Sequence, residues 1–224
     1  MIRDIKLGFK MLKYGLQFKT MVAMIAVFGV AGILFEVSNS DMGNLGGIYL
    51  ALVCSYFYQM VITSSVSSFV TASPMKAKIQ TIIPTLFSFG SAFIGYSLFV
   101  VCRIIRINIF GYQKGTDEYA SLMFGFILVG IMNLLIQIYN AFAYKYFMVS
   151  MIGMMVLMLP LMTLGMNDYF LDSITWNFNL PISVIMGLVL MIMGSILQYV
   201  FSKSILGKEL DPRTYKSALS RSGR

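Results

Sequence analysis

The sequence predicts an all-α membrane protein: an N-terminal amphipathic helix is followed by six transmembrane helices, and both termini are cytoplasmic. Hydrophobic residues occupy 58% of the 224 positions and charged residues only 12%, whereas soluble proteins average roughly 45–50% apolar and about 25% charged residues. In water, such a chain would expose large apolar patches. Six stretches reach the roughly 20 apolar residues that a transmembrane helix needs: residues 20–37, 48–70, 82–102, 120–143, 147–166 and 181–201.

The basic residues orient these six stretches. Fourteen of the 17 Lys and Arg residues lie before the first stretch, between the second and third, between the fourth and fifth, or after the sixth. Arg103, Arg106 and Lys114 lie in the third connection. Because Lys and Arg concentrate in cytoplasmic loops, we expect both termini in the cytoplasm. The net charge of +8 is therefore attributed to orientation and to contact with anionic lipids, and no nucleic-acid partner is expected.

Residues 1–19 form the first expected element, an amphipathic helix in the cytoplasmic interface. At helical spacing, Ile2, Ile5, Phe9, Leu12 and Leu16 share one face, which is flanked by lysines. We interpret this helix as a lipid anchor or as an elbow that also touches a cytoplasmic partner. It precedes a six-helix transmembrane domain at 20–201, and residues 202–224 follow as a basic cytoplasmic tail.

The connection between the second and third stretches predicts a short cytoplasmic helix. Ser73 is a good N-cap, and Pro74 suits the first helical position. The next residues suffice for about two turns before Pro84 kinks the entry to the third stretch. The alternative is an ordinary capped turn that carries two lysines. The candidate docking residues are Ser73, Pro74, Met75, Lys76, Lys78 and Gln80.

Polar and methionine stripes run along three of the stretches. The second stretch carries Ser55, Gln59 and Thr63 at four-residue spacing, and the fourth carries Asn133, Gln137 and Asn140 on one face. Because amides and hydroxyls are costly toward lipid, these faces should point at other helices or at a hydrated path. The fifth stretch has a methionine seam that is either packing or an adaptable wall for an apolar substrate: Met148, Met151, Met155, Met158 and Met162.

Arg103 and Arg106 lie one helical turn apart, just after the third stretch. We interpret them as anchors that reach into the outer interface, or as a contact for an anionic group at the outer face.

Several residue types that carry chemistry are missing. The sequence contains no His, no GxxxxGK[ST] motif, and no acidic or basic residue in the middle of any apolar stretch. Its two cysteines, Cys54 and Cys102, lie inside apolar stretches and are expected to be packing residues. We therefore expect no enzyme activity, no proton relay, and no catalytic, cofactor-binding or metal site in this chain.

The order of these elements resembles the ABC type-2 permease family, the membrane subunits of bacterial ABC exporters. The shared features are the elbow, six spans with both ends inside, the short helix between spans two and three, and an outer segment between spans five and six. The resemblance implies that Ser73 to Gln80 dock on separate ATPase subunits, which hold ATP-Mg. It also implies a dimer with a second copy or a paralogue, in the bacterial plasma membrane. The path would be lined by Ser55, Gln59, Thr63, Met151, Met155, Met158 and Met162, and would export an amphipathic peptide or lipid-like substrate by alternating access.

Two other classes remain open. Substrate-binding components of energy-coupling-factor transporters have about six spans and capture a vitamin-like ligand. Their Ala-x-x-x-Ala face in the first span is missing here, where Ala23, Ala26 and Ala31 have a different spacing. The third class is a membrane scaffold or immunity protein that transports nothing and needs no ATPase.

Overall fold

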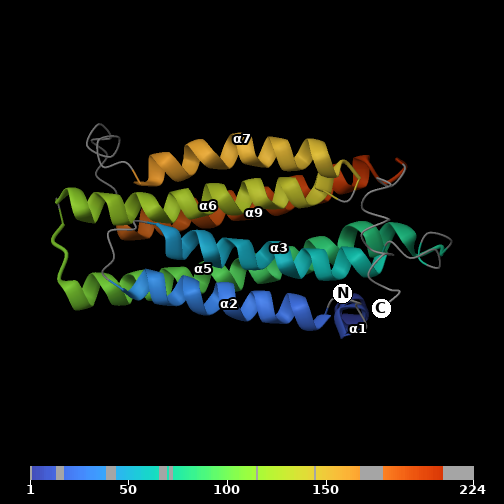
Figure 1. Cartoon of the computed structure of the whole chain (residues 1–224), viewed down its shortest axis with the longest axis horizontal. Coiled ribbons are helices and arrows are strands. Elements are labelled where there is room, and N and C mark those ends of the chain that lie inside the picture. Colours follow the sequence, from blue (N-terminus) through green and yellow to red (C-terminus); the bar gives the residue numbers. More distant parts are fainter. Residues whose placement is uncertain are drawn as a thin grey trace.

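The computed structural model describes residues 2–13, 18–38, 44–65, 70, 73–114, 116–143, 145–166 and 179–208. Every element within these ranges is a helix, and the long helices run alongside one another as a bundle (Figure 1). They are α1 (Ile2–Lys13), α2 (Phe18–Val37), α3 (Leu45–Ser65), η1 (Lys78–Ile82), α5 (Ile83–Phe110), α6 (Asp117–Ala143), α7 (Phe147–Met166) and α9 (Leu180–Ser204).

Five helical segments of this bundle are long and apolar enough to cross a membrane, as in a multi-pass membrane protein. They are α2, α3, the continuous helix Lys78–Phe110, α6 and α9. Helix α7 coincides with the fifth predicted span and packs on α6. The structure describes its side chains over Val149–Leu161, and this part of the helix is apolar. Of the other expected segments, the outer segment at 167–178 and the end of the tail at 209–224 lie outside the described residues.

The third span is longer than predicted. We expected it to end at residue 102, but the helix continues to Phe110, where Gly111 closes it in the left-handed conformation. Arg103 and Arg106 therefore lie inside a helix and are both buried, so their placement in an outer connection was wrong.

Helices α6 and α9 make the most extensive contact in the described bundle. A Cβ atom added to Gly130 would lie 2.6 Å from the Cα atom of Gly187, and one added to Gly194 would lie 2.7 Å from the Cα atom of Leu134. Small residues of this kind allow two helix backbones to approach closely in membranes. The adjoining core is aromatic and sulfur-rich, with Phe99, Phe126, Met123, Met132 and Met191 fully buried.

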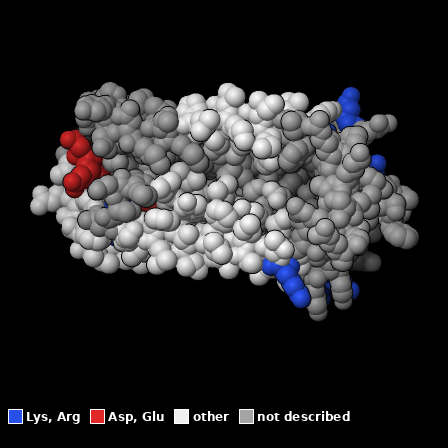
Figure 2. Space-filling view, viewed as in Figure 1, with Lys and Arg blue, Asp and Glu red and all other residues white. Residues whose placement is uncertain are grey.

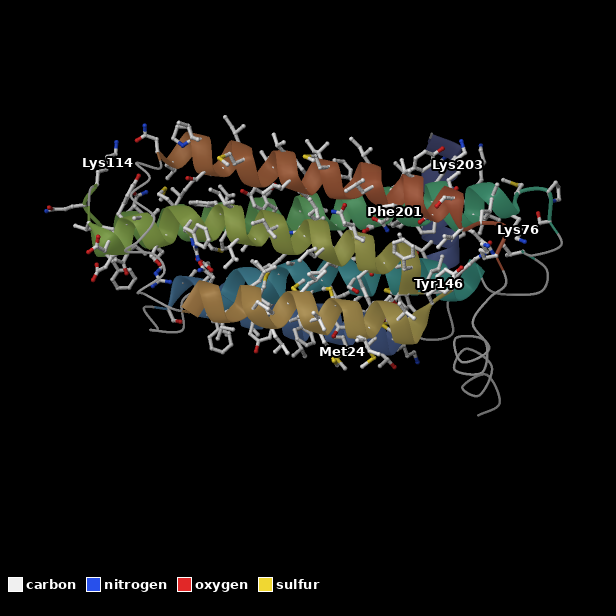
Figure 3. All side chains as sticks on the ribbon, turned by 90° about the horizontal axis from the view of Figure 1, so that it is seen from above. Met24, Lys76, Lys114, Tyr146, Phe201 and Lys203 are labelled. Atoms are coloured by element: carbon white, nitrogen blue, oxygen red, sulfur yellow. The ribbon has the colours of Figure 1, made fainter. Side chains whose placement is uncertain are left out.

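Charges are sorted between the two ends of the bundle. Figure 2 shows lysine and arginine at one end, here called the basic end, and aspartate and glutamate at the other, the acidic end. In Figure 3, Lys76 and Lys203 lie at the basic end and Lys114 at the acidic end. Helix α1 lies at the basic end, where α9 also finishes (Figure 1).

Helix α1 covers Ile2–Lys13 of the expected amphipathic segment and packs crosswise on the basic end of α3 and α5 (Figure 1). Leu12 is buried in a cluster with Met60, Val61 and Ile79. Phe9 lies edge-on against Phe87 of α5, with 5.2 Å between the ring centroids. The apolar face of α1 is thus turned partly toward the bundle, while Lys6 and Lys10 are exposed.

Candidate functional site

The predicted docking segment Ser73–Gln80 begins with a capped turn but does not form a separate helix. The backbone N–H of Met75 donates to the Ser73 hydroxyl oxygen over 3.1 Å. From Lys76 onward the chain is helical and continues without interruption into α5. The wider turn η1 precedes α5, with the N–H of Ile83 donating to the carbonyl of Lys78. Pro84 then lies in the first turn of α5, where its missing N–H costs little.

Only part of this segment faces outward. Pro74, Met75 and Lys78 are exposed, and Lys76 is half-buried. Gln80 is buried in the bundle, so its prediction as a docking residue was wrong for this conformation. The surface that is left for a partner is Ser73–Lys78.

Lys145 joins the α6–α7 connection to the end of α9 at the basic end. It lies between α6 and α7, and its ammonium donates to the carbonyl of Leu206 over 2.8 Å and to the carbonyl of Lys208. Burial, and after it the positive charge of Lys76, lowers the pKa of Lys145 from 10.5 to about 8. The two hydrogen bonds hold the α6–α7 connection against the end of α9. The connection also lies close enough to the docking segment for Lys145 and Lys76 to repel one another.

The predicted polar faces of α3 and α6 meet. The Ser55 hydroxyl of α3 donates to the Oδ1 atom of Asn140 on α6 over 3.2 Å, and the Nε2 atom of Gln59 donates to the Ser55 oxygen over 3.4 Å. The expectation that these faces point at other helices is therefore confirmed. The side chain of Thr63, the third predicted residue of this face, lies outside the described part of the structure.

Helix α9 extends this contact into what we call the amide seam, made of Ser55, Gln59, Gln137, Asn140, Ser195 and Gln198. The Ser195 hydroxyl donates to the Oε1 atom of Gln137 over 2.7 Å. Gln198 is fully buried, and among the described residues neither of its amide atoms has a hydrogen-bond partner. The Nδ2 atom of Asn140 and the Nε2 atom of Gln137 are likewise without one in this part of the chain.

Sequence reasoning missed the α9 side of the seam. Ser195, Gln198 and Ser202 follow the same three-to-four-residue spacing as the faces that it found, so the same rule would have identified them. Buried amides that lack partners are costly in a membrane, and they mark a place where water or a polar ligand is readily accepted.

The methionine seam of α7 is separate from this polar seam. Met151 and Met155 are 38% and 52% exposed, whereas Met158 is 9% exposed and packs in the main core. The side chain of Met162 lies outside the described part of the structure. The two exposed methionines continue a broad apolar surface on α7 that includes Val149 and Val156. Among the described path residues, the polar face of α3 and the two exposed methionines of α7 therefore do not meet.

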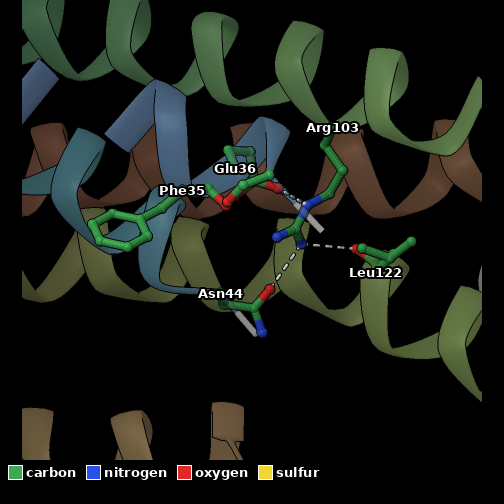
Figure 4. A network of polar contacts seen from close by, with 6 residues as sticks. Phe35, Glu36, Asn44, Arg103 and Leu122 are labelled. Atoms are coloured by element: carbon green, nitrogen blue, oxygen red, sulfur yellow. Dashed lines mark hydrogen bonds and ion pairs between the residues drawn. The ribbon is translucent and has the colours of Figure 1, made fainter. Parts of the chain in front are cut away.

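A charged network lies at the acidic end (Figure 4). The Nε atom of Arg103 on α5 donates to the Oε1 atom of Glu36 on α2 over 2.6 Å, and both side chains are 0% exposed. The Nη1 atom of Arg103 donates to the Oδ1 atom of Asn44, just before α3, over 2.8 Å, and to the carbonyl of Leu122 on α6 over 3.1 Å. One guanidinium thus joins four helices.

Two aromatic rings and a glycine surround the guanidinium of Arg103. The guanidinium carbon lies 4.4 Å from the ring centre of Phe99 and 5.6 Å from that of Phe126, which adds cation–π attraction. Gly125 leaves the necessary space, because an added Cβ atom would lie 1.7 Å from the Nη1 atom of Arg103. The interpretation of Arg103 as an interfacial anchor or anion contact was therefore wrong; it is one half of a buried ion pair.

Arg106 lies one turn further along α5 and is 7% exposed. Within the described residues its Nε and Nη1 atoms have no hydrogen-bond partner. An exposed anchor is ruled out for this side chain too. The signal that could have revealed the ion pair is the opposite charge of Glu36 and Arg103 near the same ends of neighbouring spans.

These features hold and orient helices, and they offer uncharged hydrogen-bonding groups inside the bundle. Within the described residues, no group of three or more His, Cys, Asp or Glu side chains is placed to hold a metal ion.

Comparisons of the chain with protein-family models, with curated proteins and with solved structures find no match.

Proposed function

We propose that this chain is a permease subunit of an ATP-driven ABC exporter, spanning the bacterial plasma membrane six times with both termini in the cytoplasm. The observation that carries the proposal is the composition of the basic end. There, α1, the exposed segment Ser73–Lys78, the α6–α7 connection and the end of α9 lie at one end of the bundle (Figure 1), and Lys145 bonds the α6–α7 connection to the end of α9. By the positive-inside rule this end faces the cytoplasm, where an ATPase would dock.

The remaining features support the same proposal. α7 would act as the fifth of the six spans, and its exposed face with Met151 and Met155 is available for a second copy or a paralogue. The amide seam gives the basic half of the bundle polar groups that an amphipathic peptide or lipid-like substrate could use. Because the described path residues of α3 and α7 do not meet within one chain, a second protomer would complete the path.

The test is capture of the partner ATPase. The chain would be purified in mild detergent from its native membrane, and co-purifying proteins would be identified by mass spectrometry. We expect a subunit with a GxxxxGK[ST] motif and ATP hydrolysis in the purified complex. A chain that functions normally while it retains no such subunit would contradict the proposal and favour a scaffold or immunity protein.

Charge reversal on the docking segment sharpens this test. Lys76→Glu with Lys78→Glu should leave membrane insertion intact and reduce the retained ATPase by about tenfold or more, because the segment would then present two negative charges to its partner in place of two positive ones. Lys114→Glu, at the acidic end, is the matched control and should retain the ATPase. Equal retention by the two variants would remove Ser73–Lys78 as the docking site.

A further inference from the structure

An apolar groove opens between α2 and α5, with α3 as its floor and Phe9 of α1 at its basic end. Its volume is about 620 Å³. The two walls carry Gly29 and Gly90, and a Cβ atom added to either would meet no atom of the described chain within 4 Å. These glycines keep the groove open. We call it the α2–α5 groove.

The part of an occupant that lies in this groove must be hydrocarbon. Of the residues that line it, Ser91 is the one with a polar side chain, and its hydroxyl already donates to the carbonyls of Phe87 and Ser88 over 2.9 and 3.0 Å. Its α5 wall runs from Leu86 to Leu98, which is about 18 Å at 1.5 Å per residue. One leaflet of a bilayer contributes about 15 Å of hydrocarbon. The groove therefore has the length of an acyl chain in one leaflet.

The end of the groove at α1 is positively charged. Phe9 lines the groove, and Lys6 lies one helical turn away on α1 with its side chain exposed. Residues three apart on a helix are neighbours on its surface. Lys10 and Lys19 are also exposed near this end. A ligand whose chain fills the groove would thus place its headgroup beside cations at interfacial depth.

We infer that the α2–α5 groove is a binding site for one anionic phospholipid, with an acyl chain between α2 and α5 and the headgroup phosphate at Lys6. Charge complementarity with α1 and the one-leaflet length of the groove single out this occupant over a second copy of the chain. The inference is independent of the proposed transport function, since it requires only that the bundle lies in a membrane.

Photolabelling tests the site directly. The full chain would be reconstituted in phosphatidylcholine vesicles that contain a little phosphatidylglycerol with a photoreactive acyl chain, and labelled peptides would be mapped by mass spectrometry. We expect labelling within 25–33 and 86–98, about tenfold stronger than with the same reactive chain on phosphatidylcholine, a difference set by the headgroup. Equal labelling by the two lipids would overturn the inference.

Variants distinguish binding of the acyl chain from recognition of the headgroup. Gly90→Leu fills the groove and should reduce labelling by both lipids about tenfold, with Gly29→Leu on the opposite wall as a second version. Lys6→Glu should abolish only the preference for phosphatidylglycerol. Gly153→Leu on α7 is the matched control, because its added side chain also meets open space, and it should label as the wild type does.

Two further readouts keep the test decisive. Cys54 and Cys102 are buried, so their resistance to a thiol reagent verifies that each leucine variant is folded. Labelling of folded Gly90→Leu and Gly29→Leu at the wild-type level would refute the site. An oxidised dimer of Gly29→Cys, together with absent lipid labelling in the wild type, would assign the groove to a second copy instead.

Discussion

Replacing Glu36 by Gln should leave the buried guanidinium of Arg103 without its counter-charge. Both side chains are 0% exposed and their closest atoms are 2.6 Å apart. Removing one partner of a buried pair costs about 3–5 kcal/mol, because the other charge stays desolvated. For a chain of this size, about 2–4 °C of unfolding temperature is lost per kcal/mol. We therefore expect Glu36→Gln to unfold about 6–20 °C below the wild type.

The chain provides its own reporter for this measurement. Cys54 and Cys102 are its two cysteines and both are buried, so a thiol-reactive fluorophore in detergent reports the temperature at which the bundle opens. Glu118→Gln is the matched control, since Glu118 is exposed at the same end of the molecule. This surface change should cost less than about 0.5 kcal/mol.

A double-mutant cycle attributes the loss to the ion pair. In an Arg103→Met background the cation is gone, so adding Glu36→Gln should cost much less than it does in the wild type. An equal cost in the two backgrounds, or a Glu36→Gln variant as stable as Glu118→Gln, would refute the reasoning that this pair joins the helices.

Three other variants test the packing and the basic end. Gly187→Ala should destabilise the bundle by about 1–3 kcal/mol, because the new Cβ atom would lie 2.5 Å from a backbone carbonyl oxygen of α6. Gly153→Ala is the control and should leave stability unchanged, because its Cβ atom meets open space. The thiol-reactive fluorophore assay measures the unfolding temperature of both variants. Gly125→Ala should lower the unfolding temperature, and lower it less once Arg103 has been replaced by Met. The pKa of Lys145 is about 8 in the fold against 10.5 unfolded, so the unfolded state binds more protons between these values. Wild-type stability relative to Lys145→Met should therefore rise from about pH 8 to about pH 10.5, and a flat difference would contradict the burial of this ammonium.

Much of the bundle could be predicted because a bilayer imposes helix length and apolar composition on each span. The third span is the exception. Counting apolar residues stops at Arg103, whereas the helix continues to Phe110 because a glutamate 67 residues earlier neutralises the guanidinium. Composition within one segment cannot reveal a partner on another. The wider turn before Pro84 was missed as well, since spacing along the sequence does not reveal a π turn.

The candidate site was predictable where a pattern repeats along one helix. The polar faces of α3 and α6 were found by spacing alone, and Ser55 does contact Asn140. The burial of Gln80 was not predictable, because it depends on how the docking segment packs against the bundle. The separation of Met151 and Met155 from the polar face likewise depends on where α7 lies.

The two polar features join the helices with bonds of different strength at the two ends of the bundle. At the acidic end, one guanidinium joins α2, α3, α5 and α6 through charged hydrogen bonds that are costly to break. At the basic end, the amide seam joins α3, α6 and α9 through neutral hydrogen bonds and leaves the Gln198 amide without a partner among the described residues. Opening the seam would break neutral hydrogen bonds and let water reach the Gln198 amide, whereas separating α2 from α5 would break a buried ion pair and its charged hydrogen bonds. Because charged hydrogen bonds are the stronger ones, we expect the helices to separate more readily at the basic end than at the acidic end.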